Sequence, residues 1–420
     1  MLATGPHIIV WAICALATAG VIVRPLRWPE AIWACLGPLL LMSLRLVTPA
    51  AAGAAALRGL DVYLFLAGMM LLSETARREG LFDFVAAAAV NHAAGDPRRL
   101  FLLIYGVGAA ITAFLSNDAT AVVLTPAVYA AARKAEVDPL PFLLICAFVA
   151  NAASFVLPIS NPANLVLYGD HTPPLLRWLA SFALPSILSI GATYGMLRWT
   201  EGRRLPQLCR REATLPPLPA GAWTALIGIA LTAVVLMTVS ALNIPLGAPT
   251  CLMGLLTTAV VLVRRREGPW ATLKGVSWSI LPLVAGLFVM VQALQDTGVI
   301  AALARLVSTV LRQAPATGPW ALGGMLAVAC NLMNNLPAGL IASSTIAQAH
   351  PSGRAVDALL IGVDLGPNLS VTGSLATILW LTAIRREGEA VGFWRFLRIG
   401  ALVMPPALLT ALAARLLWAR

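Results

Sequence analysis

The chain has 420 residues, of which 59% are hydrophobic and only 11% charged, with a net charge of +11 and a mean hydropathy of +0.85. Soluble globular chains carry about 25% charged residues, so the composition excludes an ordinary soluble enzyme, a disordered protein and a secreted disulfide scaffold. No stretch is polar enough to form the exposed basic domain that nucleic-acid binding needs. The excess positive charge is better explained by basic loops that orient membrane spans.

Apolar runs that alternate with basic loops predict five membrane spans in the first half of the chain. A transmembrane helix needs about 20 mostly apolar residues. With the basic loops placed inside, the predicted spans are 7–23, 30–48, 60–76, 139–168 and 174–198. No Lys or Arg precedes the first hydrophobic run, so we interpret it as a retained span and not as a signal peptide. Residues 81–95 have the pattern of an amphipathic helix at the interface.

Between the third and fourth spans, the apolar runs 100–115 and 119–132 are separated by the polar string FLSNDATA. Both outer flanks are basic, since Arg98 and Arg99 precede the first run and Arg133 and Lys134 end the second. A re-entrant hairpin keeps both flanks on the same side. Non-helical backbone at membrane depth is tolerated only where it is buried in protein or lines a cavity. The sequence therefore predicts a hairpin whose polar tip is buried.

The second half repeats this plan after a basic, proline-rich linker. Its predicted spans are 221–242, 246–263, 276–294, 355–384 and 399–417. Residues 297–313 form a second amphipathic segment, and 318–348 a second hairpin with the tip CNLMNNLPAGL. The fourth span of each half is interrupted, by VLPISNPANLVL in the first and by DLGPNLSVTGS in the second.

The two halves are related as an internal repeat. LSNDATA (115–121) aligns with LMNNLPA (332–338) at an offset of 217 residues. Five spans is an odd number, so equivalent parts must face opposite ways across the membrane. Inverted repeats with discontinuous helices are typical of secondary transporters. The predicted fold class is an all-α polytopic membrane protein, with five spans and one re-entrant hairpin in each repeat.

Four strings resemble the ion transporter superfamily, and most closely its arsenite/antimonite efflux carriers: FLSNDATAVVLTP (114–126), ISNPANLV (159–166), MNNLPAGL (333–340) and GVDLGPNLSVTGSLATILWL (362–381). One departure is that some members carry Lys-Leu-Thr where this chain has Asn368-Leu369-Ser370. The resemblance implies an elevator-type carrier that exports trivalent arsenic or antimony as the neutral trihydroxide. It also implies proton antiport or, in some systems, a partner ATPase, and it suggests a homodimer.

The resemblance also implies a division into scaffold and transport parts. The scaffold parts would be 1–97 and 220–314, and the transport parts 98–200 and 315–420, with a cytoplasmic linker at 201–219. Each transport part would hold one hairpin and one broken helix. The expected location is the cell inner membrane.

Polar residues at the tips and breaks are the candidate substrate ligands. A neutral polyhydroxyl solute needs hydrogen-bond donors and acceptors, and Asn, Ser and Thr supply both. The candidates are Ser116, Asn117, Asn161, Asn164, Asn334, Asn335, Asn368, Ser370, Thr372 and Ser374. The candidate helix-break residues are Pro162, Pro337, Gly366, Pro367 and Gly373.

Two acids, Asp118 and Asp364, sit on a hairpin tip and a helix break at presumed mid-depth. A lone carboxylate there is costly unless it is paired or protonated, and intramembrane acids commonly serve as proton relays or ion sites. We expect Asp118 to couple transport to protons, with Asp364 as its partner or as a second site. The alternative is that each accepts hydrogen bonds from helix N-termini and stays charged.

Other functions stay open at this stage. A sodium- or proton-coupled carrier of di- or tricarboxylates or inorganic anions fits less well, because the charge of Asp118 would repel a dianion. A non-transporting scaffold or receptor would not need paired broken helices. The six cysteines and four histidines form no metal-ligand pattern, and we expect neither a cofactor nor enzyme chemistry. The arginines of 198–211 fit basic topology, and they could also dock an acidic cytosolic partner.

Overall fold

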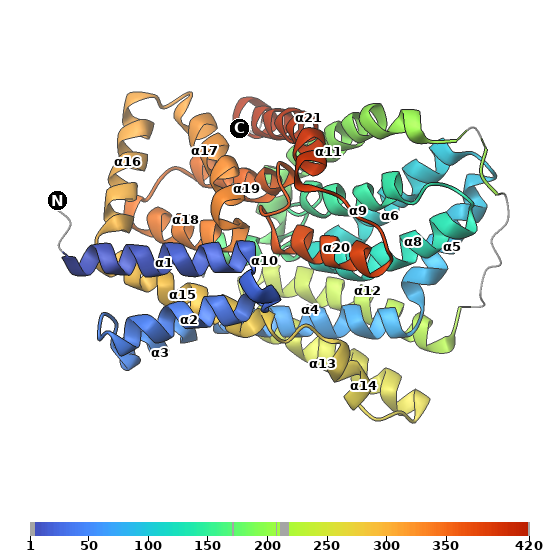
Figure 1. The fold of residues 1–420 in the computed structure, drawn as a ribbon, viewed down its shortest axis with the longest axis horizontal. Coiled ribbons are helices and arrows are strands. Elements are labelled where there is room, and N and C mark those ends of the chain that lie inside the picture. The colour runs from blue at the N-terminus through green and yellow to red at the C-terminus, as the bar shows by residue number, and fades with distance from the viewer. Residues whose placement is uncertain (1–4, 170–171, 207, 211–217, 419–420) are drawn as a thin grey trace.

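The computed structural model describes residues 5–169, 172–206, 208–210 and 218–418, and every regular element in these ranges is a helix (Figure 1). The helices of the first half are α1 (Gly5–Val23), α2 (Glu30–Ser43), α3 (Pro49–Leu57), α4 (Leu60–Arg78), α5 (Leu81–Ala93), α6 (Pro97–Phe114), α7 (Asn117–Ala119), α8 (Thr125–Lys134), α9 (Leu140–Ala152), α10 (Pro162–Tyr168) and α11 (Leu175–Glu201). A π-helical turn, Thr120–Leu124, joins α7 to α8.

The helices of the second half follow the same order. They are α12 (Ala220–Ala241), α13 (Gly247–Arg265), α14 (Trp270–Gly275), α15 (Ile280–Asp296), α16 (Val299–Gln313), α17 (Gly318–Met333), α18 (Asn335–Ala349), α19 (Gly353–Leu365), α20 (Leu375–Arg386) and α21 (Phe393–Ala413). Each of the ten predicted spans coincides with one helix or with a pair of helices on either side of a break. The expected all-α polytopic architecture is confirmed.

Six described helices are individually long and apolar enough to cross a membrane, namely α1, α6, α11, α12, α13 and α21. The number rises to eight if the bent pairs α3–α4 and α15–α16 each count as one span. The other predicted spans fall short as continuous helices, because α2 has 14 residues and the fourth span of each half is split in two. Helix α6, which was predicted as one arm of a hairpin, is thus by itself long and apolar enough to cross a membrane.

The helix bounds differ from the prediction around residues 44–57. The predicted span 30–48 ends as a helix at Ser43, and a separate helix, α3, fills 49–57. Thr48 starts α3 by accepting a hydrogen bond from the N–H of Ala51, and Pro49 occupies the first helical position. The chain then bends by 52° into α4.

The repeat is visible in the packing. Helix α4 of the first repeat packs along α13 of the second, and the equivalent pair, α15 of the second repeat and α2 of the first, packs in the same way. The last spans of the two repeats, α11 and α21, also lie side by side. The two predicted amphipathic segments form α5 and α16. Helix α5 packs against both arms of the first hairpin, α6 and α8, and α16 packs against both arms of the second, α17 and α18. These helices therefore support the hairpins.

The hairpins and broken spans pack crosswise. The returning arm of the second hairpin, α18, contacts α10 of the first broken span. The returning arm of the first hairpin contacts α20 of the second broken span. Each hairpin is therefore completed by the other repeat, and all four interrupted segments meet in one region.

Candidate functional site

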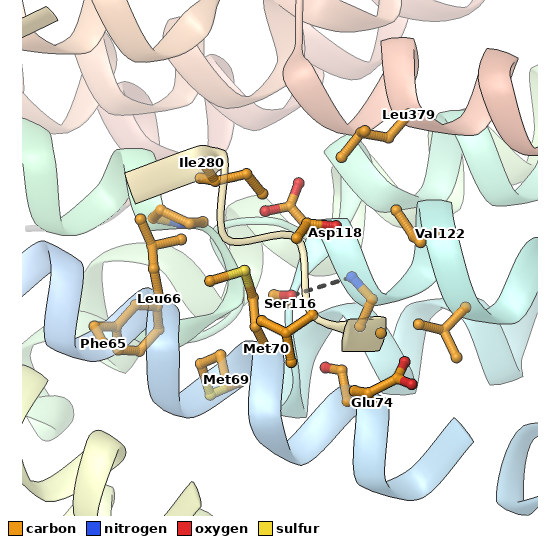
Figure 2. A pocket seen from close by; sticks show the side chains of 17 residues that line it. Phe65, Leu66, Met69, Met70, Glu74, Ser116, Asp118, Val122, Ile280 and Leu379 are labelled. Atoms are coloured by element: carbon orange, nitrogen blue, oxygen red, sulfur yellow. Dashed lines mark hydrogen bonds between the residues drawn. The ribbon is translucent and has the colours of Figure 1, made fainter. Parts of the chain in front are cut away.

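The first hairpin turns at Leu115 and Ser116, between α6 and α7. Ser116 is extended, and its Oγ caps the returning arm by accepting a hydrogen bond from the N–H of Ala119 at 3.2 Å. The Oδ1 of Asn117 accepts the N–H of Asp118 at 3.0 Å. The carboxylate of Asp118 has no hydrogen-bond or ion-pair partner among the described residues, and it projects into a cavity (Figure 2).

The cavity lies between α4 and the tip of the first hairpin, with a volume of about 60 Å³, enough for a few water molecules. The chain segment that leads from α14 into α15 forms part of its wall (Figure 2). Most of the wall is apolar: Phe65, Leu66, Met69, Met70, Val122, Val123, Val276, Ile280 and Leu379. The polar side chains are Ser73, Glu74, Ser116, Asp118 and Ser277, and the described lining contains no basic residue.

Glu74 brings a second carboxylate to this cavity from the last turns of α4. Its side chain is buried, and Arg77 holds it through two hydrogen bonds, from Nε to Oε2 at 2.7 Å and from Nη2 to Oε1 at 2.6 Å. Such bidentate, charge-assisted pairs are stronger than neutral hydrogen bonds. Glu74 was not among the residues singled out from the sequence, since an acid beside two arginines has the pattern of an ordinary span flank.

Asp364 lies away from the cavity lining, in the last turn of α19. Its side chain is fully buried, and its Oδ1 accepts a hydrogen bond at 2.5 Å from Nδ2 of Asn161, the residue that caps α10. The second oxygen, Oδ2, has no described partner. Asn164, one turn further along α10, donates to the carbonyl of Ser154 at 2.8 Å. The two repeats are thus joined around an acid that makes no described ion pair.

A second buried contact joins the repeats at Asn368. Its Oδ1 accepts a hydrogen bond from Nδ2 of Asn151 at 3.0 Å, and its own Nδ2 donates to the carbonyl of Phe148 at 3.1 Å. Asn151 also donates to Oγ1 of Thr377 in the first turn of α20, at 3.3 Å. Asn151 and Asn368 are separated by the same 217 residues that relate the two hairpin tips. The internal repeat itself was the sequence signal that could have identified Asn151.

The second hairpin tip is tied to the second break. Asn331, one turn before the tip, accepts hydrogen bonds at its Oδ1 from Oγ of Ser370 at 2.8 Å and from the N–H of Ser370 at 3.0 Å. Its Nδ2 donates to the carbonyl of Gly366 at 2.9 Å, and its carbonyl accepts Oγ1 of Thr372 at 2.9 Å. Ser370 and Thr372 therefore use their hydroxyl groups within the protein.

Asn334 and Asn335 continue this contact at the tip itself. Asn334 has a φ of +76°, caps α18 through its Oδ1, and donates from Nδ2 to the carbonyl of Thr372 at 3.3 Å. The N–H of Asn335 donates to the carbonyl of Gly373 at 2.8 Å, while its buried Oδ1 has no described partner. Ser374 caps α20 by accepting the N–H of Ala376 at 3.1 Å.

The proline and glycine residues chosen as helix breakers lie at or next to helix starts. Pro162 is the first residue of α10 and lines the cavity, and Pro337 lies in the first turn of α18. Gly366 and Pro367 form a single 3₁₀ turn after α19. A Cβ on Gly366 would lie 2.3 Å from the carbonyl oxygen of Ala327, and one on Gly373 would lie 2.5 Å from Cα of Pro367. Both positions require glycine because the backbones approach so closely.

The structure therefore divides the candidate residues into two groups. Ser116, Asp118 and Pro162 line the cavity. The remaining polar candidates are buried or part-buried, and most form hydrogen bonds within and between the tips and breaks. The sequence had given no signal for the contribution of α4 and of the segment 275–277, because their residues belong to no motif and reach the cavity only through tertiary packing.

Comparison with known proteins identifies the family to which this chain belongs. A family model described as "Citrate transporter" matches residues 9–365. The chain belongs to the citrate transporter family. Among its relatives is the arsenical pump membrane protein of Yersinia enterocolitica, which is 29% identical over 359 residues, covering 82% of this chain and 83% of that protein. The arsenical pump membrane protein of Escherichia coli (strain K12) is 28% identical over 363 residues, with the same coverage of both chains.

The fold resembles that of a transporter whose crystal structure is known. The crystal structure of the Alcanivorax borkumensis YdaH transporter, described as having an unusual topology, superimposes with a TM-score of 0.60 at 16% identity and covers 92% of this chain and 97% of that one. The resemblance to arsenite/antimonite carriers of the ion transporter superfamily, inferred from four short strings, is confirmed. This citrate transporter family member is a multi-pass membrane protein.

Proposed function

We propose that this chain is a secondary active transporter that exports trivalent arsenite or antimonite, as the neutral trihydroxide, in exchange for protons. One observation carries the proposal: the cavity at the first hairpin tip is lined by two carboxylates and by no described basic side chain. Such a site disfavours an anion, whereas a neutral trihydroxide can donate hydrogen bonds to carboxylate and hydroxyl oxygens. The printed names of the curated relatives support an arsenical substrate.

In this mechanism Asp118 holds the coupling proton. Its carboxylate faces the cavity without a described partner, so that either a proton or a hydroxyl of the substrate can satisfy it. When substrate occupies the cavity, Asp118 accepts its hydrogen bond as the carboxylate. When the site returns empty, a proton from the opposite side neutralises Asp118, which lowers the cost of moving it through the membrane. Asp364, paired with Asn161, is the second proton site.

We further propose an elevator movement. The cavity walls come from both parts of the division inferred from the resemblance: α4 and residues 275–280 belong to the scaffold parts 1–97 and 220–314, and the hairpin tip with Pro162 and Leu379 belongs to the transport parts 98–200 and 315–420. Sliding one part against the other would carry Asp118 from one side to the other. The segment 201–219 would link the repeats on the cytoplasmic side; its residues 207 and 211–217 lie outside the described part of the chain.

The test is transport of arsenite by the purified protein in liposomes, with and without a pH gradient and with no other protein present. Flux that follows the imposed gradient is expected. Absence of flux would contradict the proposal that the chain acts as an antiporter without a partner protein. Restoration of flux by a cytosolic ATPase would then identify that enzyme as the source of energy. A homodimer is expected, and the mass of the purified particle tests it.

The second candidate function is a sodium- or proton-coupled carrier of di- or tricarboxylates or inorganic anions. The description of the matching family model favours it, and the two carboxylates of the cavity count against it. Sodium-dependent uptake of citrate by the same liposomes, without arsenite flux, would establish this function in place of the first. We propose no enzymatic activity for the chain.

A further inference from the structure

We propose that Glu74 is a specificity-determining residue, a fixed negative charge that excludes anions from the cavity in the state in which α4 lines it. The inference rests on the proposed function, in which Asp118 is alternately charged and neutral. While Asp118 is protonated it no longer repels an anion. A second carboxylate, held in an ion pair with an arginine, would keep the site closed to anions in that state also.

The surroundings of Glu74 hold its carboxylate in place. Arg77 binds both of its oxygens, at 2.7 and 2.6 Å. Gly275 also packs directly on the carboxylate, because a Cβ at that position would clash with Oε1. Glu74 is only 5% exposed, whereas the side chain of Arg77 is 49% exposed. The positive partner is therefore screened by solvent, while the carboxylate lines the cavity.

The other charged groups near this pair leave the cavity negative. Asp83 of α5 interacts electrostatically with Arg77, and Asp118 of the first hairpin faces the same cavity. Lys274 precedes Gly275 but is exposed and does not line the cavity. The lining thus contains two acids and no described base. Like charges in a confined site strongly disfavour an anionic ligand, and a neutral solute is not affected.

The experiment is inhibition of arsenite flux by arsenate and by citrate in proteoliposomes at constant ionic strength. Each variant is normalised to its own uninhibited rate. In the unmodified protein both anions should inhibit weakly. For Glu74→Gln we expect the inhibition constant for each anion to fall by about tenfold or more. Glu74→Asp, which keeps the charge, should behave like the unmodified protein. Unchanged anion inhibition in Glu74→Gln would overturn the proposal.

A matched control and a double variant identify the cause. Glu79 is the residue that follows α4 as its C-cap, pairs with Arg265 at 2.8 Å and does not line the cavity. Glu79→Gln should therefore leave anion inhibition unchanged. The double variant Glu74→Gln/Arg77→Gln should remain sensitive to anions, since the lost carboxylate is the cause. Sensitivity confined to the single variant would assign the effect to the released Arg77 and would overturn the role given to Glu74.

A binding measurement separates this inference from the proposed function. If the unmodified protein moves no arsenite, the proposed function fails, but the charge of the cavity can still be tested. Thermal unfolding of the purified protein is then followed against citrate concentration. Stabilisation of Glu74→Gln by citrate, without stabilisation of the unmodified protein or Glu79→Gln, supports anion exclusion by Glu74. No stabilisation of Glu74→Gln contradicts it.

Discussion

The two hairpin tips are aligned in sequence but serve different surroundings. The first tip places Asp118 in the cavity, and among the described residues one hydrogen bond joins it to its own broken span, from Oγ of Ser160 to the carbonyl of Ala113 at 2.9 Å. The second tip has Asn335 at the aligned position, buried to 2% exposure. Asn331, Asn334 and Asn335 tie that tip to its broken span by several hydrogen bonds.

This difference shows how a duplicated motif can specialise. Both tips keep the polar residues that cap a returning arm, because a helix end in the membrane must satisfy its N–H groups. Only the first has an acid without a described partner. At the offset of 217 residues, Asn331 corresponds to Phe114, which is 49% exposed and forms no comparable contact. We infer that the first tip contributes to substrate binding and that the second stabilises the contact between its hairpin and its broken span.

The largest expected effect on transport comes from Asp118→Asn. The change removes the only titratable group at the first tip, so arsenite flux should no longer follow a pH gradient, with a fall of at least about tenfold, equal to about 1.4 kcal/mol. Flux into liposomes at several imposed gradients measures it. The control is Asp83→Asn, on α5 outside the cavity lining, whose arsenite flux should still follow the pH gradient as in the unmodified protein. Gradient-driven flux in Asp118→Asn would remove Asp118 from the coupling mechanism.

An acid placed at the second tip should lower the free energy of unfolding. Asn335→Asp buries a carboxylate where the Asn oxygen has no described partner, and an uncompensated buried charge costs about 3–5 kcal/mol. Thermal unfolding in detergent measures the loss. Asp118→Asn, at the aligned position in the cavity, should change stability by less than about 1 kcal/mol. Equal stability of both variants would contradict the contrast drawn between the tips.

The contacts of Asn331 should have an intermediate effect. Asn331→Ala leaves the Ser370 N–H and the Gly366 carbonyl without their partner, so we expect a loss of about 2–3 kcal/mol. Phe114→Ala at the aligned position should cost less than about 1 kcal/mol. The same unfolding assay compares them. A larger loss for Phe114→Ala would reverse the assignment of the structural tip.

The smallest effect is expected for the cap of the first tip. Ser116→Ala removes the hydrogen bond to the N–H of Ala119, which is worth about 1 kcal/mol. Asn334→Ala should cost about 1 kcal/mol more, because it removes both the cap on the N–H of Leu336 and the hydrogen bond to the carbonyl of Thr372. Unfolding midpoints of the two variants should therefore differ in that order, and the reverse order would show that the two turns are not held as described.

Much of the fold could be predicted because its signals are local. Basic flanks marked the hairpin between Arg98 and Lys134, and Asn-Pro and Gly-Pro pairs marked the two breaks. The alanine-rich helix α3 has neither charge nor periodicity to separate it from the preceding span. The cavity was only half predicted, since Asp118 belongs to a motif, whereas Glu74 and Gly275 come together through packing of segments about 200 residues apart.

The crossed pairing of the repeats also sets the order in which the site can form during synthesis. Asn161 must wait for Asp364, 203 residues later, and Asn151 for Asn368, 217 residues later. Until then the first half of the chain holds polar groups in the membrane without their final partners, where lipid offers none. The newly made first half is thus an incomplete protein, and the side-chain amides of Asn151 and Asn161 find these partners only when residues 364–368 have left the ribosome and entered the bilayer.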